Sequence, residues 1–576
     1  MTWHSTFARF STQDSPHSLR PTLRWLGAAG AAAVLAGCAS TPLPPWASST
    51  PAKPAPAATA AAAVPASTHQ PARTTPVAPN TELEVLPYAG EVAVRFPDPA
   101  VRYQTPGLES GRRSFTTNTE LNALLQKLSI DSLGQPVRLA QITAGTSQQG
   151  QVISALVATQ GEGVNPGALD ATGRPTLLIV AGQQGTDAAP TEALLAMAKE
   201  LAPGGLLHAQ LSKANVILVP RANPDGFDSG TAATANGVVL TEDHLLLQTP
   251  EAQALAKLVR DYRPSVILDA EEFPAIQPTL AQFNALRSND AGLQYGYSPN
   301  VHEFVAKAER EWLYRPVVDS LTQAGLRVDW AYSASSSDKT LRMASPAPTS
   351  LHNVSALKNT PSLTVQSRGA DLQRTHIQRR VHTLVTAMGA ALNDTIARSA
   401  DLGKVQSFVA RDIASQACSG QLTVAAQALQ TQREVQMLDP QTGADQGVRA
   451  AWVSATELRS TLQRPRACGY WLSAQSEQAV ERLRLLGVQV QRVAEQAPVL
   501  SDGYSNAGGK IVVSRNAIDA APGSYYISMN QPLANVAAAA LEPDTAYSYV
   551  SQGLVSSLGD LARVMAPTSL VFEEED

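Results

Sequence analysis

Residues 175–202 read PTLLIVAGQQGTDAAPTEALLAMAKELA. An apolar run is followed by a glycine-containing turn and then by residues whose apolar side chains recur with helical spacing. A short apolar run bounded by such a turn is typical of a buried strand, so the stretch predicts a strand, a tight turn and a helix. In α/β proteins, ligands bind beyond the carboxyl ends of strands. Gln184 and Asp187 occupy that place here.

The same alternation of strand and helix continues on both sides of this stretch. Apolar runs such as QVISALVAT and ANVILVPRA alternate with amphipathic runs such as PEAQALAKLVRDY. This order predicts an α/β domain over residues 85–400, with a mixed β-sheet flanked by helices. Alternating apolar residues in TELEVLPYAGEVAVRF, residues 81–96, predict an early strand. Residues 401–576 change in texture and predict a smaller C-terminal accessory region of short strands and one strong helix.

The N-terminal 84 residues have the features of export and tethering rather than of a folded domain. Residues 1–38 carry arginines, an apolar run and Leu35-Ala36-Gly37-Cys38, which resembles the lipobox of bacterial lipoproteins, where the cysteine is lipidated. The alternative is an ordinary signal peptide with an incidental cysteine. Ala39 follows the cysteine, which by this resemblance indicates the outer membrane, facing the periplasm. Residues 39–84 are rich in Ala, Pro and Thr and predict an extended tether.

The net charge bears on which partners the protein binds, and the cysteines bear on the compartment in which it folds. The chain has 44 basic and 49 acidic residues and a formal charge of −5, which gives no reason to expect nucleic acid. A lipid anchor at Cys38 would make the membrane a partner and leave Cys418 and Cys468. In an exported chain these two cysteines favour one disulfide, and two free buried thiols are the alternative.

Four blocks in the right order resemble the zinc carboxypeptidase family, the carboxypeptidase A-like metallopeptidases. They are GTSQQG at residues 145–150, the opening stretch, NVILVPRANPDGFD continuing to SVILDAEEF, and LTVQSRGADLQRTHIQRRV at residues 363–381. The resemblance covers residues 110–400 and implies the family's sheet, zinc site and peptidase activity. It also implies a peptide ligand, or a fragment of the cell wall.

Each chemical position that the resemblance identifies carries a different residue in this chain. The zinc ligands fall at Gln184, Asp187 and Glu271, so both imidazoles are absent. The general-base glutamate falls at Gln366, and an amide cannot accept the proton of a zinc-bound water. The anchors for the substrate carboxylate fall at Thr241, Glu242 and Ala232, so the guanidinium that attracts that carboxylate is replaced by a repelling acid.

The substitutions leave three readings of the function. The first is a pseudopeptidase that binds peptide or cell-wall fragments in the former active-site cleft. The second is an altered metal site of oxygen ligands, from Gln184, Asp187 and Glu271, which would favour calcium, magnesium or manganese over zinc. The third is a surviving hydrolase, either the zinc-dependent carboxypeptidase or one that uses Ser336 and Lys339, a spacing found in some serine hydrolases.

Overall fold

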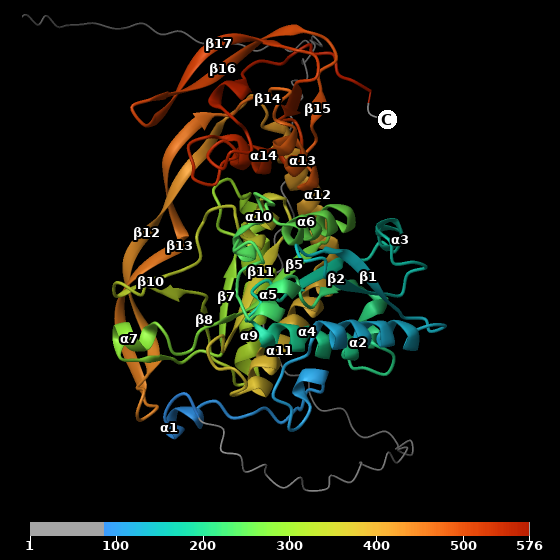
Figure 1. Ribbon diagram of the computed structural model, residues 1–576, viewed down its shortest axis with the longest axis vertical. Helices are drawn as coiled ribbons and strands as arrows, with labels where there is room; N and C mark the ends of the chain where they lie inside the picture. Colours follow the sequence, from blue (N-terminus) through green and yellow to red (C-terminus); the bar gives the residue numbers. More distant parts are fainter. Residues whose placement is uncertain (1–85, 575–576) are drawn as a thin grey trace, which may run out of the picture. The chain divides into compact units, whose positions relative to one another are not determined.

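A computed structural model of the chain describes residues 86–574 (Figure 1). The signal peptide expected at residues 1–38, with its lipidation site Cys38, and the tether expected at residues 39–84 lie outside the described residues. No helix within residues 86–574 is both long enough and apolar enough to span a membrane.

The central sheet confirms the mixed α/β class expected from the sequence. Over residues 86–574 it has eight strands in the order β1-β2-β4-β3-β5-β11-β7-β8. Strands β3, β4, β5 and β11 run parallel, whereas β1, β2 and β7 pair with antiparallel neighbours. The strands are β1 (Arg138–Thr146), β2 (Val152–Thr159), β3 (Thr176–Ala181), β4 (Asn215–Val219), β5 (Val266–Phe273), β7 (Ala291–Tyr295), β8 (Val328–Trp330) and β11 (Ser362–Arg368).

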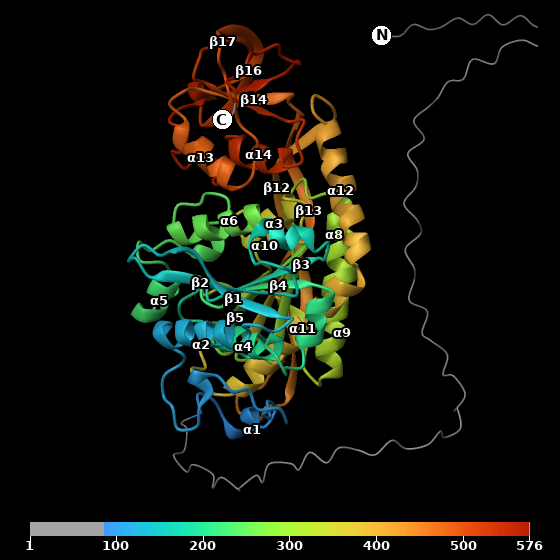
Figure 2. The ribbon, with the colours of Figure 1, turned by 90° about the vertical axis from the view of Figure 1, so that its right-hand side faces the viewer.

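Helices cover both faces of this sheet, which explains why its inner strands β3, β4 and β5 are buried along their whole length (Figure 2). Helices α4, α9 and α11 lie on one face, and α6 and α10 lie on the other. The helices of this region are α2 (Asn118–Asp131), α3 (Pro166–Ala171), α4 (Ala188–Leu201), α5 (Pro224–Ser229), α6 (Pro250–Tyr262), α7 (Thr279–Phe283), α8 (Glu303–Ala308), α9 (Arg315–Gln323), α10 (Leu351–Leu357) and α11 (Ile377–Ala397).

The early strand expected in residues 81–96 is wrong for the part that the structure describes. A short helix, α1 (Gly90–Ala93), forms there instead. Val92 and Phe96 are four residues apart, and both are buried against Leu286 and Leu438. One turn of helix brings such a pair to the same side, whereas a strand with this alternation would need a neighbouring sheet edge.

A long hairpin joins the region after residue 400 to the α/β domain. Helix α12 (Ser399–Ser415) leads to β12 (Gln421–Leu438) and β13 (Asp445–Pro465), so the short strands expected here are wrong for this part. The hairpin pairs with β6 (Leu286–Arg287) and β10 (Thr340–Arg342), and β10 pairs in turn with β9 (Ser333–Ala334). This sheet crosses the domain boundary expected near residue 400.

The C-terminal residues form a further sheet, shown in orange to red in Figure 1. In the described part of the chain it has six strands, in the order β15-β18-β14-β19-β16-β17, with two helices. These elements are β14 (Gly469–Leu472), α13 (Glu477–Leu485), β15 (Gln491–Arg492), β16 (Ala497–Ala507), β17 (Lys510–Ala520), β18 (Tyr525–Ser528), α14 (Ala534–Leu541) and β19 (Leu561–Val564). A disulfide between Cys418 and Cys468 links the two ends of the hairpin segment.

A buried carboxylate holds the end of the hairpin to this C-terminal sheet. Glu542 accepts hydrogen bonds from Arg464 of β13 at 2.7 Å and from Arg563 of β19 at 3.0 Å. The hydroxyls of Tyr470 and Tyr504 donate to it at 2.7 and 3.1 Å. Each oxygen of the carboxylate therefore has a charged partner and a hydroxyl partner, which compensates for its removal from water.

We expect Glu542→Ala to lower the free energy of unfolding by about 3–5 kcal/mol, because it removes the shared acceptor of two buried guanidinium groups and two buried hydroxyls. Arg464 keeps Asp544, and Arg563 keeps Asp502 at 3.7 Å. Glu573→Ala, which removes the acid of an exposed ion pair with Arg492, is the matched control and should cost less than about 1 kcal/mol. Urea unfolding followed by tryptophan fluorescence measures both. Equal losses in the two variants would contradict this role of Glu542.

Candidate functional site

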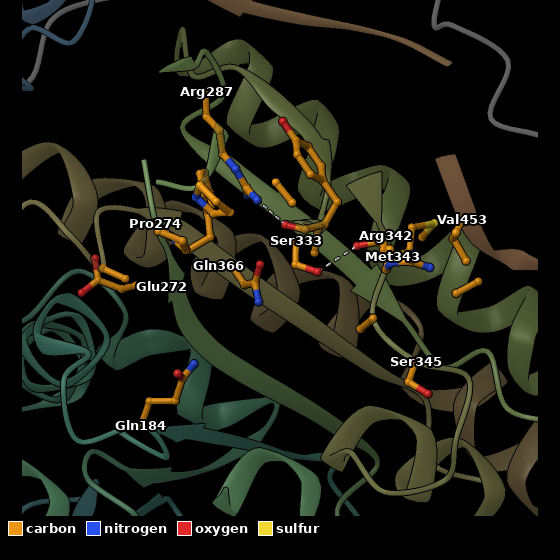
Figure 3. A pocket seen from close by; sticks show the side chains of 18 of the residues that line it. Gln184, Glu272, Pro274, Arg287, Ser333, Arg342, Met343, Ser345, Gln366 and Val453 are labelled. Carbon is orange, nitrogen blue, oxygen red and sulfur yellow. Dashed lines mark hydrogen bonds between the residues drawn. The ribbon is translucent and has the colours of Figure 1, made fainter. Parts of the chain in front are cut away.

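A cavity of about 590 Å³ lies at the carboxyl ends of β3, β5 and β11 (Figure 3). Gln184, Asp187, Glu242 and Gln366, four of the positions singled out from the sequence, line it. The opposite wall comes from the segment around β9 and β10 and from Ala428, Val453 and Ala455 of the β12–β13 hairpin. The region after residue 400 thus supplies part of the cavity wall. The sequence alone does not show whether this region packs against the cavity.

The turn after β3 has a backbone that requires glycine. A Cβ atom on Gly185 would lie 2.1 Å from the carbonyl carbon of Gly226 and 2.4 Å from the nitrogen of Phe227, so no other residue fits. The turn delivers Gln184 to the cavity, half-buried, and places Asp187 at the start of α4. The geometry of the turn is therefore fixed by its backbone, independently of the side chain at position 184.

Asp187 is a buried acid with one oxygen unused. Its side chain is only 3% exposed. Oδ2 accepts from the backbone nitrogen of Glu272 at 2.9 Å, and Oδ1 has no hydrogen-bond partner among the described residues. Burial, reinforced by the nearby carboxylates of Glu272 and Glu271, raises the pKa of Asp187 well above its usual range. The group therefore tends to hold a proton at pH values where an exposed aspartate is ionised.

Two of the positions singled out from the sequence, Gln366 and Glu271, bond to each other. Gln366 on β11 is directly opposite Glu271 on β5 in the parallel register. Its Nε2 donates to Oε2 of Glu271 at 2.8 Å. Burial raises the pKa of Glu271 and raises that of Asp269, two residues earlier, well above its usual range. The amide and the acid satisfy one another, as a structural pair does.

A second hydrogen-bonded chain continues away from the cavity. Gln183 donates from Nε2 to Oδ1 of Asp269 at 2.8 Å, and its Oε1 lies 2.7 Å from Nε2 of His244. With this orientation of the amide, His244 carries its proton on Nε2 and donates it. Burial lowers the pKa of His244 to about 3, so the ring is neutral. The imidazole of His244 is thus engaged in this chain through Nε2.

Glu272 fastens the site to the scaffold. Its carboxylate accepts two hydrogen bonds from Arg380, each of 2.8 Å, and Oε2 also accepts from the nitrogens of Ala188 and Ala189 at 3.1 Å. Those nitrogens are the first of α4, where a negative charge is favourable. One side chain of β5 thereby fixes the start of α4 and the helix α11 that carries Arg380.

The remaining predicted positions lie apart from this group. Within the described part of the chain, Thr241 and Ala232 are not among the residues that line the cavity, whereas Glu242 lines it and is exposed. The carbonyl of Ala232 accepts from the nitrogen of Gly185 at 3.3 Å, a backbone role that any residue could fill. Ser336 and Lys339 are exposed in the turn between β9 and β10.

The residues at the ligand positions do not fit zinc. Gln184 offers a neutral carboxamide, Asp187 uses Oδ2 on the backbone of Glu272, and Glu271 uses Oε2 on Gln366, so each acid has at most one oxygen left. Zinc prefers the nitrogen of imidazole and the sulfur of thiolate, together with carboxylate oxygen. No imidazole is present in this set. Over residues 86–574, no three His, Cys, Asp or Glu side chains are grouped in a way that could hold a metal ion.

Sequence reasoning missed two side chains of the cavity wall, Arg287 and Tyr332. Arg287 lies in the two-residue strand β6, and Tyr332 directly precedes β9. Neither belongs to a motif or to a periodic segment, so nothing in the sequence marks them. They reach the cavity because β6 pairs with the distant β12.

The protonated acids beside the cavity predict that stability falls as pH rises. The folded protein holds protons that the unfolded chain loses above about pH 4, so the free energy of unfolding decreases with pH up to the raised pKa of Asp187. Asp187→Asn keeps an acceptor for Glu272 and removes the charge. We expect it to stabilise the protein at pH 8 by about 1–3 kcal/mol and to flatten the pH dependence. Urea unfolding at pH 5 and pH 8 measures this.

Asp519→Asn, at an exposed position of β17, is the control and should change neither quantity. A destabilised Asp187→Asn at pH 8 would contradict the assignment of a strained buried acid.

Comparison with known proteins agrees with this geometry. Residues 124–241 match the family model described as zinc carboxypeptidase. Carboxypeptidase 2 of Trichophyton rubrum is 23% identical over 398 residues, covering 65% of this chain and 73% of the relative. Carboxypeptidase 2 of Trichophyton equinum is 23% identical over 402 residues, covering 66% and 74%.

Among solved structures, carboxypeptidase A of Helicoverpa armigera aligns with a TM-score of 0.38 and 14% identity, over 50% of this chain and 74% of that one. The metallo-carboxypeptidase of Burkholderia cenocepacia aligns with a TM-score of 0.34 and 13% identity, over 47% and 69%. Residues 124–241 thus match the zinc carboxypeptidase family, and the chain is similar to carboxypeptidases over about two thirds of its length.

Proposed function

We propose that this protein is a pseudopeptidase that binds peptides or cell-wall fragments in the former active-site cleft without hydrolysing them. The observation that carries the proposal is the 2.8 Å hydrogen bond from Gln366 to Glu271. It joins the position of the general base to the position of a metal ligand and occupies one oxygen of Glu271. An amide at the base position cannot accept the proton that the family's chemistry removes.

The retained cavity supports a binding role. Its volume of about 590 Å³ is within the range of small-molecule pockets and is large enough for a short peptide. Its backbone is held by the close approach at Gly185 and by the Glu272–Arg380 pair, which depend on no metal. Glu242 at the former anchor position would repel a carboxylate there. The ligand is therefore expected to bind differently from the substrate of an exopeptidase.

The activity test compares the wild-type protein with a variant in which the missing groups are restored. After loading with zinc and dialysis, we expect less than about 0.1 zinc per wild-type chain and no hydrolysis of a generic carboxypeptidase substrate. The combined variant Gln184→His, Glu271→His and Gln366→Glu should gain close to one zinc per chain. Metal analysis and a chromogenic assay give the two readouts.

The matched control is Gln184→Asn, Glu271→Gln and Gln366→Asn, which alters the same positions without adding imidazole or a base. Stoichiometric zinc in the wild type, or hydrolysis that Gln366→Ala abolishes, would overturn the pseudopeptidase proposal. Titration with calcium and manganese in the same experiment decides whether the oxygen ligands bind a different metal.

We also propose that the protein is lipid-anchored at Cys38 in the cell envelope, at the outer membrane and facing the periplasm. The support is the sequence Leu35-Ala36-Gly37-Cys38 and the Ala, Pro and Thr-rich stretch that follows it. The disulfide between Cys418 and Cys468 is consistent with an oxidising compartment.

Replacing the lipidated residue tests the anchor. We expect Cys38→Ala to move the protein from the membrane fraction to the soluble fraction, because the lipid supplies the membrane affinity. Ser40→Ala, two residues away, should leave the distribution unchanged. Fractionation with immunoblotting measures both, and retention of Cys38→Ala in the membrane fraction would contradict the anchor.

A further inference from the structure

Arg287 is a buried cation in the wall of the cavity without an acid to pair with. The residue is 1% exposed, among the largest fully buried side chains in the protein. No carboxylate within residues 86–574 lies at ion-pair distance from it. Burying an unpaired charge is costly, and proteins normally pair such a group or place it against a ligand.

The surroundings of Arg287 fix the plane of its guanidinium. The ring of Tyr332 lies 4.1 Å and the ring of Phe273 lies 4.7 Å from its central carbon, so aromatic groups cover the guanidinium. Nη2 donates to the carbonyl of Tyr332. Nε has no partner among the described residues, and neither does the hydroxyl of Tyr332. Two donors beside the cavity are therefore unused.

The acids nearest to this arginine are occupied elsewhere. Asp371 accepts from the backbone nitrogens of Ala275 and Ile276 at 2.7 and 2.9 Å. Asp329 pairs with Arg433. Burial lowers the pKa of Arg287, Tyr332, Asp371 and Asp329 act to raise it, and Arg368 acts to lower it. Because neither aspartate lies at ion-pair distance from Arg287, an anion in the cavity would be its direct partner.

The wall that carries Gln184 also carries an acid, Glu242. In Figure 3, Arg287 reaches toward the centre of the view from the side opposite Gln184. Asp187 and Glu242 line the cavity together with Gln184. A carboxylate at the family's former anchor would meet Glu242, whereas a carboxylate at the edge of the guanidinium would meet unused donors.

We propose that Arg287, assisted by the hydroxyl of Tyr332, is the anion anchor of this cleft and receives the carboxylate of a bound peptide. This inference rests on the proposed binding function and names the chemical group that the site recognises. It places the carboxylate on the wall formed by β6 and the segment before β9, away from Thr241, Glu242 and Ala232.

The test uses N-acetyl-trialanine with a free carboxylate and the same peptide as its C-terminal amide, titrated into the full mature protein by calorimetry. We expect the carboxylate form to bind about tenfold more tightly or better, because a charge-assisted bond to a desolvated guanidinium is lost in the amide. In Arg287→Gln the two forms should bind equally. Arg492→Gln, the same substitution at an exposed ion pair outside the cavity, should keep the preference.

A second arm separates this inference from the proposed function. Acetate alone should raise the unfolding temperature of the wild type and of Arg492→Gln, and should not raise that of Arg287→Gln. Equal binding of acid and amide by the wild type overturns the anchor and leaves the binding function standing. If neither peptide binds, the proposed binding function fails, and the acetate measurement alone tests the role of Arg287. An equal response to acetate in all three proteins overturns that role.

If Arg287→Gln does not fold, Arg287→Lys replaces it. That variant keeps the charge and removes the planar fork, so the preference for the carboxylate form should fall at least threefold. An unchanged preference in Arg287→Lys, or equal binding of the two forms by the wild type, which needs no variant, overturns the proposal.

Discussion

The ion pair between Glu272 and Arg380 is the interaction on which the architecture of the cleft depends. Neither side chain is appreciably exposed, and the carboxylate also accepts hydrogen bonds from the first two backbone nitrogens of α4. A strand end, a helix start and a second helix are thereby fixed to one point. A buried pair of this kind specifies geometry more than it adds net stability, because desolvation offsets much of the Coulomb attraction.

The architecture of the cavity does not depend on the side chains at positions 184 and 366. The turn after β3 is shaped by the backbone contact at Gly185, and the end of β5 is shaped by Glu272. Gln184 and Gln366 project from positions that are held by other residues. A substitution there alters what the cavity can bind and does not release the strands or helices that form it.

The elements that sequence analysis predicted are those with a local signal. The apolar strand β3, the turn and α4 follow from residues that are adjacent in the chain, so the α/β class and the strand-end site could be predicted. Helix α1 and the length of the β12–β13 hairpin could not, since both depend on contacts with distant segments. Arg287 was missed for the same reason. It lies in a two-residue strand, and only the folded structure places it between Phe273 and Tyr332.

The resemblance predicted site positions at Glu271 and Gln366, and it could not indicate which hydrogen bonds these residues make. The structure shows Glu271 and Gln366 bonded to one another and His244 engaged with Gln183. Such pairings require side-chain orientation across neighbouring strands, and no pattern within one strand encodes it.

The hairpin also affects when the cleft can form during synthesis. Strand β5 and the turn after β3 are complete once the chain has been made to residue 273, whereas Val453 and Ala455 line the same cavity. Domains that are made from the N-terminus tend to fold as their segments emerge. Here the sheet can assemble before its cleft has a full wall, because the wall is complete only after the chain has been made to residue 455.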